Sequence, residues 1–181
     1  MANRADDHSN VPPVGRHAAH RELTLDTTSP EGTIRLGAAV GRLCEPNAVI
    51  ALVGPLGAGK TQMTKGIAEG LGVADPRKVA SPTFVLEQEY AGRLKLRHLD
   101  AYRLAGPTDL WDIGIDEMGK AGGVVVVEWA ERAAEALPAD ALWVHLEPTG
   151  ERSRRLGFTA NGPRSTKLLE RLSRAVDGEH F

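Results

Sequence analysis

The sequence has 181 residues, of which 25% are charged, with a formal net charge of -2 and one cysteine. This length suits one domain with a full hydrophobic core, and the slightly acidic balance argues against a surface built mainly to coat nucleic acid. Cys44 cannot form an internal disulfide, so nothing indicates an oxidising compartment, and we expect a small buried side chain rather than a nucleophile.

Residues 1–20 are polar and lack the apolar centre of a secretory signal. They show no periodicity, which predicts a disordered tail ahead of a single domain over residues 21–181. The histidines of the tail have irregular spacing and no neighbouring cysteines, which favours solvated side chains over a metal site. No apolar run in the chain reaches membrane-spanning length, so we expect a soluble, cytoplasmic protein.

The first predicted elements alternate strand, helix and strand. Residues 21–27 alternate polar and apolar side chains, as in a strand with one buried face. Thr28 or Ser29 is expected to cap a helix that begins with a proline and continues to Cys44. Residues 48–53, AVIALV, are apolar throughout, which is typical of a parallel strand buried on both faces.

This second strand runs directly into a glycine-rich turn that fits the P-loop pattern of glycine, four residues, glycine, lysine, and serine or threonine. The turn consists of Gly54, Pro55, Leu56, Gly57, Ala58, Gly59, Lys60 and Thr61. Glycines let successive backbone N–H groups converge on phosphate oxygens, and the helix that follows adds the positive end of its dipole. We expect Lys60 to bridge the β- and γ-phosphates, with its head group in solvent when no nucleotide is bound, and the Thr61 hydroxyl to bind Mg²⁺. A turn that merely joins strand to helix is the alternative, but the context favours a nucleoside triphosphate site.

The rest of the chain alternates strands and helices. Residues 84–90 and 93–100 flank an Ala-Gly turn, which predicts an antiparallel hairpin. Residues 107–121 indicate a helical stretch, and the valine run that ends at Glu128 indicates a second fully buried strand. The remaining predicted elements are a helix ending near Leu137, strands over 141–148 and 153–160, and a leucine-rich helix over 164–176. This order predicts a three-layer α/β fold with a mixed sheet.

Two carboxylates could complete the phosphate site, because a P-loop needs an acidic side chain from a neighbouring strand to hold the metal or its water. Glu128 ends the valine strand, so its side chain should emerge at the carboxyl edge of the sheet beside the P-loop. Asp100 ends the alternating strand and is the second candidate. For each, the plain alternative is an exposed carboxylate at a strand end. Trp129 is expected to pack, or to neighbour the nucleotide or a partner.

The residues alone narrow the class to a small P-loop nucleotide hydrolase or kinase. The guanine-recognition patterns NKxD and TKxD are absent, and no segment resembles the signature loop of transporter ATPases. The arginine-rich segment over 150–155 leaves room for the lid of a small nucleotide kinase.

Five short motifs resemble those of the bacterial TsaE (YjeE) family in order and spacing. They are GPLGAGKT, SPTF (81–84), HLDAYRL (98–104), DIGIDE (112–117) and VVEW (126–129). The resemblance covers roughly Leu23 to Phe158. One departure is Pro55 at the rim of the loop, where the family usually carries an acidic residue, and this bears on nucleotide affinity.

The resemblance implies a P-loop NTPase fold, a three-layer sandwich with a mixed, mainly parallel sheet, and a Mg²⁺-dependent ATP hydrolase. Its metal site would consist of Thr61 and Glu128. Thr83 would lie in a switch-like loop near the γ-phosphate, and Asp100 would act on the switch or the attacking water. The alternative for Asp100 is a carboxylate that fixes the local loops through Tyr102 or Arg103.

Weaker alignment implies that Glu31 and Arg152 line the nucleotide pocket, with simple surface charge as the alternative for each.

The family is implied to support threonylcarbamoyladenosine modification of tRNA at adenosine 37 without transferring the group itself. It would bind the TsaD–TsaB pair and reset that assembly by ATP hydrolysis, so that tRNA is reached only through the complex. Two other classes stay open: a stand-alone P-loop small-molecule kinase, and a nucleotide-dependent binding module with negligible turnover.

Overall fold

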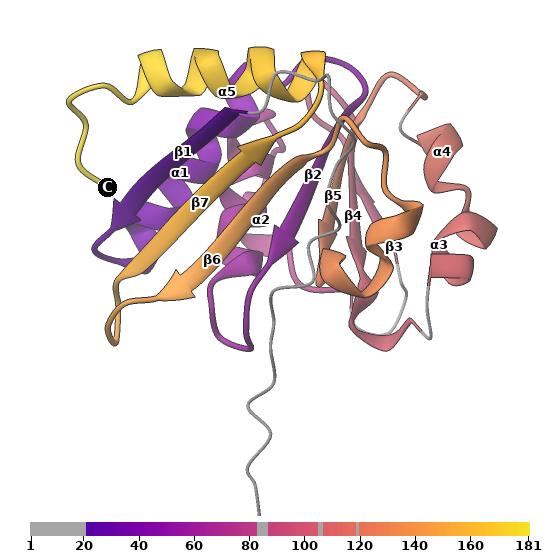
Figure 1. The fold of residues 1–181 in the computed structure, drawn as a ribbon, viewed down its shortest axis with the longest axis horizontal. Coiled ribbons are helices and arrows are strands. Elements are labelled where there is room, and N and C mark those ends of the chain that lie inside the picture. Colours follow the sequence, from indigo (N-terminus) through magenta and orange to yellow (C-terminus); the bar gives the residue numbers. More distant parts are fainter. Residues whose placement is uncertain (1–20, 83–86, 105–106, 119) are drawn as a thin grey trace, which may run out of the picture.

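The computed structural model describes residues 21–82, 87–104, 107–118 and 120–181, which form a seven-stranded sheet with helices (Figure 1). The predicted tail over residues 1–20 and the candidate Thr83 lie outside the described residues. The strands are β1 (Arg21–Thr27), β2 (Ala48–Val53), β3 (Glu87–Tyr90), β4 (Leu96–Asp100), β5 (Val124–Glu128), β6 (Leu142–Pro148) and β7 (Arg154–Ala160). The α-helices are α1 (Pro30–Leu43), α2 (Lys60–Gly70), α3 (Pro107–Ile113), α4 (Ile115–Met118) and α5 (Pro163–Ala175). Short 3₁₀ helices are η1 (Pro76–Lys78), η2 (Ala101–Arg103) and η3 (Ala130–Ala136).

The strand order in the sheet is β1-β7-β6-β2-β5-β4-β3. β2 lies parallel to both β5 and β6, and β5 lies parallel to β4. β7 is antiparallel to β6 and β1, and β3 is antiparallel to β4. The predicted mixed sheet is therefore confirmed, with β7 and β3 running against the direction of the other strands.

The two central strands are apolar because each has a hydrophobic core on both faces. Ile50 and Leu52 of β2 pack in the core that includes α1, α2 and α5, whereas Val49 and Ala51 pack in the second core with α3 and η3. β5 alternates in the same way, and all five of its residues are buried. The continuous apolar runs that predicted buried parallel strands thus have a direct physical cause.

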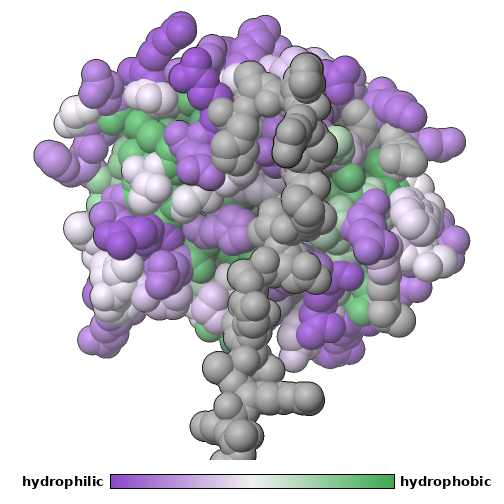
Figure 2. Space-filling model, viewed as in Figure 1, coloured by the Kyte–Doolittle hydropathy of each residue, from purple (hydrophilic) through white to green (hydrophobic). Residues whose placement is uncertain are grey.

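The sheet has helices on both faces over only part of its width. α1 and α2 lie behind β1, β7 and β6 in Figure 1, and α3 contacts η3 and α4. On the opposite face of β1 and β7, the described side chains are polar, and Asp26 and Arg155 form an exposed ion pair. The same view in Figure 2 shows hydrophilic side chains over most of the described surface, with hydrophobic ones between them. Three layers are present where β2, β5 and β4 form the middle.

Two predicted helices differ from the observed ones. The helical stretch over 107–121 is divided into α3 and α4 at Gly114, whose φ of 82° no α-helix accommodates. The segment after Trp129 is the 3₁₀ helix η3 rather than an α-helix, and Ala133 interrupts it with a φ of -138°.

Two other expectations concern single features of the chain. Cys44 is 2% exposed, and burial raises the pKa of its thiol to about 12, so it is the inert buried side chain that was expected. Within the described ranges, no helix combines the length and apolar character needed to cross a bilayer.

Candidate functional site

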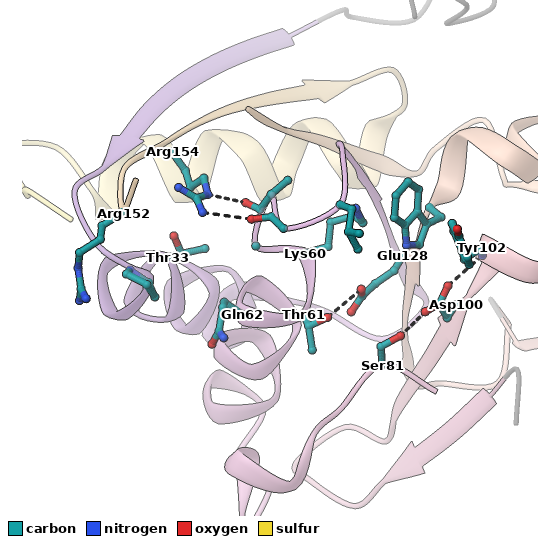
Figure 3. Close-up of a pocket in the computed structure, with 16 residues that line it drawn as sticks. Thr33, Lys60, Thr61, Gln62, Ser81, Asp100, Tyr102, Glu128, Arg152 and Arg154 are labelled. Atoms are coloured by element: carbon teal, nitrogen blue, oxygen red, sulfur yellow. Dashed lines mark hydrogen bonds between the residues drawn. The ribbon is translucent and has the colours of Figure 1, made fainter. Parts of the chain in front are cut away.

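A cleft of about 610 Å³ opens at the carboxyl ends of β2, β5 and β4 (Figure 3). This is within the usual size range of small-molecule sites, and the carboxyl edge of a parallel sheet is where α/β folds bind ligands. Its lining consists of Pro30, Thr33, Leu56, Gly57, Ala58, Gly59, Lys60, Thr61, Gln62, Ser81, Asp100, Tyr102, Glu128, Trp129, Arg152 and Arg154. Segments far apart in the sequence therefore meet around the P-loop.

The P-loop conformation requires glycine. Gly57 has a φ of 77°, and Gly59, the residue that precedes α2, has a φ of 104°. Side-chain-bearing residues rarely adopt these values, so glycine allows the chain to turn tightly here. Ala58 N donates to Pro55 O at 3.1 Å, which closes the turn ahead of the helix. Gly54 and Pro55, predicted to contact nucleotide, are outside the cleft lining, while the rest of the loop lines it.

Lys60 is 5% exposed and its ammonium group already has partners. Its Nζ donates to the carbonyl oxygens of Gly54 and Pro55 and lies 3.6 Å from the centroid of the Trp129 ring. The expectation that this head group lies in solvent without nucleotide is wrong, because the loop carbonyls and the aromatic face together shield it from water. Burial lowers the pKa of Lys60, and the Glu128 carboxylate opposes that shift.

Trp129, whose ring lies beside the Lys60 ammonium group, has an unusual backbone conformation. Its φ of 57° and ψ of 39° are left-handed, which is rare for a bulky residue and marks it as a candidate for a functional role. The Tyr102 ring lies 4.9 Å from the Trp129 ring, and the Arg132 guanidinium lies 5.0 Å from the Tyr102 ring. Lys60 and Arg132 thus lie at the two ends of a tilted pair of aromatic rings, and both rings line the cleft.

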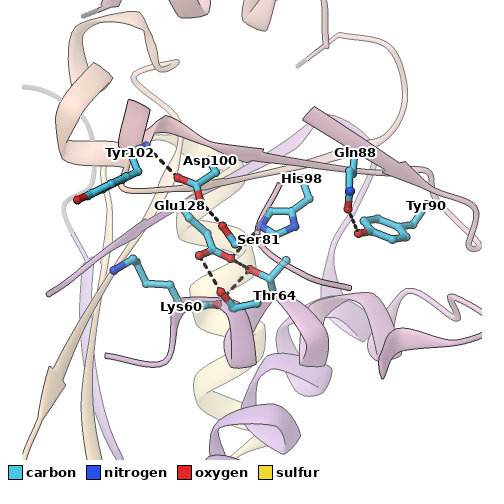
Figure 4. Close-up of polar contacts among 10 residues, drawn as sticks. Lys60, Thr64, Ser81, Gln88, Tyr90, His98, Asp100, Tyr102 and Glu128 are labelled. Atoms are coloured by element: carbon cyan, nitrogen blue, oxygen red, sulfur yellow. Dashed lines mark hydrogen bonds and ion pairs between the residues drawn. The ribbon is translucent and has the colours of Figure 1, made fainter. Parts of the chain in front are cut away.

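Glu128 is the centre of a buried polar network (Figure 4). Its Oε2 accepts from the Thr61 hydroxyl at 3.0 Å, and its Oε1 accepts from the Thr64 hydroxyl at 3.2 Å. His98 Nε2 lies 2.8 Å from the same Oε1. A buried carboxylate needs such donors to offset its desolvation, so three side chains fix the direction of this one.

Asp100 lies next to Glu128 in the register of β4 and β5. It accepts from the Ser81 hydroxyl and, through Oδ1, from Tyr102 N at 2.9 Å. The bond to Tyr102 N caps η2, which is what the loop-fixing alternative expects of this carboxylate. Its position in the cleft is equally compatible with a role towards the attacking water.

Glu31 and Arg152 form an exposed ion pair of 3.1 Å at the outer end of the cleft. Arg152 lines the cleft, but Glu31 is one residue beyond the lining Pro30. The pair therefore lies at the rim of the cleft and not at its centre.

Three residues that contact the site in the structure have no role assigned from the sequence. Thr64 lies three residues after Thr61 on the same face of α2, and His98 lies two residues before Asp100 on the same face of β4, so periodicity could have indicated both. Arg154 reaches the P-loop from β7, and no local pattern in the sequence signals that contact.

The oxygen donors of Thr61 and Glu128 fit a bound Mg²⁺. The two side chains are within hydrogen-bond distance of each other, and hydroxyl and carboxylate oxygens are ligands that this hard cation prefers. In the described part of the chain, no cluster of three or more histidine, cysteine or acidic side chains offers a site built from protein ligands alone.

Comparisons with known proteins identify the family of this chain. A family model described as threonylcarbamoyl adenosine biosynthesis protein TsaE matches residues 27–156. The TsaE protein of Bacillus subtilis is 41% identical over 155 residues, which cover 85% of this chain and 96% of the relative. TsaE of Treponema pallidum is 44% identical over 128 residues, covering 71% and 93% respectively. The crystal structure of B. subtilis YdiB has a TM-score of 0.72 at 36% identity and covers 86% of this chain and 97% of its own. The chain therefore belongs to the TsaE family of proteins that act in tRNA threonylcarbamoyladenosine biosynthesis.

Proposed function

We propose that this protein is a Mg²⁺-dependent P-loop ATP hydrolase that binds the TsaD–TsaB complex and resets it between rounds of tRNA modification at adenosine 37. One observation carries the proposal: Lys60, Thr61 and Glu128, from a P-loop and from the strand beside it, converge in a single cleft. These are the residue types that P-loop NTPases use for phosphate and for metal.

Lys60 has to change partners when nucleotide binds. Its ammonium group exchanges the carbonyl oxygens of Gly54 and Pro55 for oxygens of the β- and γ-phosphates, which carry full charge and bind it more strongly. The N-terminus of α2 adds its positive dipole end at the same place.

Thr61 and Glu128 hold the metal in this proposal. A Mg²⁺ ion held there would supply positive charge to the phosphate oxygens. Thr64 and His98 keep one carboxylate oxygen of Glu128 engaged, so the other oxygen stays directed at Thr61.

Asp100 is proposed to act on the switch or to orient the attacking water, and Thr83 is proposed to belong to a switch-like loop near the γ-phosphate. Asp100 accepts hydrogen bonds from Ser81 and from Tyr102 N, which connect its carboxylate to the segment after η1 and to η2. A movement of either segment therefore alters the position of the carboxylate, which gives a bound partner a route to change the hydrolysis rate.

Membership of the TsaE family supports the coupling role, and it predicts slow hydrolysis by the isolated protein. TsaD holds the transferase site in this scheme, and the present protein contacts tRNA only through the complex. ATP hydrolysis then restores the assembly for the next round, as in other P-loop switches.

The test is multiple-turnover threonylcarbamoylation of tRNA in a mixture of TsaD, TsaB, tRNA and a threonylcarbamoyl donor. Added wild-type protein should raise the product well above one round per complex, and Lys60→Ala should not. Lys167→Ala is the control, since this lysine lies on α5 and forms an exposed ion pair with Glu45. Equal product with wild type, Lys60→Ala and no added protein would refute the coupling role, and an ATP-dependent phosphorylated metabolite without partners would support the kinase instead.

A further inference from the structure

Arg154 contacts the P-loop although the two lie far apart in the sequence. It stands at the start of β7, and its Nε donates to Ala58 O at 3.0 Å while its Nη2 donates to Gly57 O at 3.1 Å. Figure 3 shows both bonds leaving one guanidinium group towards adjacent carbonyls of the loop. These contacts join residues that lie 96 and 97 positions apart in the chain.

The rest of the same guanidinium is anchored in the β6–β7 connection. Its Nη1 donates to Ser153 O at 2.7 Å and to Gly150 O at 3.1 Å. A guanidinium is planar and its donors have fixed directions, so anchoring one side determines where the other side points. The start of β7 therefore directs two guanidinium donors, Nε and Nη2, at the P-loop.

Fixing these two carbonyls also fixes the amides that follow them. Each trans peptide is planar, and its N–H points away from its C=O, so holding Ala58 O orients the N–H group of Gly59. Holding Gly57 O supports the turn in which Ala58 N donates to Pro55 O. The loop needs such a restraint because Gly57 and Gly59 have little intrinsic preference for one conformation. Backbone N–H groups that are already oriented bind phosphate without the entropic cost of ordering the loop.

We propose that Arg154 is a positioning residue that holds the P-loop in its phosphate-binding conformation before nucleotide arrives. This inference rests on the proposed nucleotide site and adds a residue that acts on the loop rather than on the nucleotide. Arg155 is its matched control, because it is the next residue of the same strand, carries the same charge and pairs with Asp26 on the exposed face.

The first measurement is ADP affinity by calorimetry in the presence of Mg²⁺. Arg154→Ala should weaken binding about tenfold, because a loop that is no longer held has to be ordered when phosphate binds, whereas Arg155→Ala should match wild type. Arg154→Lys should remain several-fold weaker than wild type, because an ammonium group cannot bond two adjacent carbonyls in this fixed geometry. Full affinity in the lysine variant would show that only the charge matters and would overturn the proposal.

The second measurement uses the nucleotide-free protein and so does not depend on ADP binding. Backbone amide hydrogen exchange by NMR should be faster at Ala58 and Gly59 in both Arg154 variants than in Arg155→Ala. Faster exchange confined to residues 149–153 would mean that Arg154 only stabilises the connection between the strands, and the proposal would fall. If wild-type protein binds no ADP, the nucleotide site is refuted, while exchange at Ala58 still decides whether Arg154 restrains the loop.

Discussion

The two oxygens of Glu128 have different partners, and this difference determines what the residue can do. Oε1 faces Thr64 and His98 in the interior, whereas Oε2 faces Thr61 at the cleft. His98 is fully buried, and its Nδ1 has no hydrogen-bond partner among the described residues. A ring nitrogen without a proton tolerates that situation better than an N–H would, so we infer that Nε2 carries the proton and donates to Glu128.

Glu128→Gln should weaken Mg²⁺-dependent ADP binding by about tenfold or more, because the amide keeps the shape of the side chain but loses the charge that attracts the cation. Asp100→Asn should have a smaller effect on this quantity, since the carboxylate of Asp100 is engaged by Ser81 and Tyr102 N. The measurement is ADP affinity with and without Mg²⁺ for both variants. A greater loss of Mg²⁺ dependence in Asp100→Asn would mean that the roles of the two carboxylates are reversed.

At the scale of elements, α1 and α2 pack unusually closely through glycines. A Cβ added at Gly37 or Gly41 would overlap backbone atoms of α2, and one added at Gly66 or Gly70 would overlap backbone atoms of α1. The glycines are four residues apart on each helix, so each pair lies on one face, and the two faces meet. This contact sets the position of α2, whose first turn carries Lys60 and Thr61.

Gly66→Ala should destabilise the protein by about 2–3 kcal/mol, because the new methyl group would overlap the Ile34 carbonyl and force the helices apart. Chemical denaturation provides the free energy of unfolding. Gly157→Ala is the control: it lies in β7, and the nearest atom to its added Cβ would be the His145 Cβ at 4.0 Å, an ordinary contact. Similar free energies for the two variants would show that the helix contact is less tight than the structure has it.

Elements with a clear local pattern of apolar residues could be predicted from sequence, and those that depend on distant packing could not. Strands β2 and β5 are apolar because both faces are covered, and that signal is local. The break between α3 and α4 rests on the positive φ of Gly114, which a helical pattern of apolar residues does not register. Likewise, η3 begins from the left-handed Trp129, a conformation that no local pattern signals, and the Trp129 ring packs against Lys60 and Tyr102.

At the scale of the whole molecule, the site is assembled where the central parallel strands meet the outer antiparallel ones. The P-loop and the position of Glu128 were predictable, because each follows an apolar strand and parallel strands end at the same edge. Thr64 and His98 share a face with Thr61 and Asp100, so periodicity could have indicated them, whereas Arg154 reaches the loop through a long-range contact that only the folded chain reveals. The sequence thus predicted the groups proposed to meet phosphate and metal, but not those that hold them in place.

The same assembly makes global stability a measure of nucleotide binding. The cleft takes residues from α1, the P-loop, β4, β5 and the start of β7, so unfolding of the chain destroys it and the ligand binds only the folded state. Mg²⁺ and ADP at a hundred times the Kd should then stabilise the wild-type protein by about 2.7 kcal/mol, which corresponds to a rise in Tm of about 5 °C or more at this size. Lys60→Ala should show no comparable rise, whereas Lys167→Ala should match wild type. Thermal unfolding with and without ligand measures both, each variant being compared with its own ligand-free Tm. An equal rise in Lys60→Ala would place the nucleotide somewhere other than the P-loop cleft.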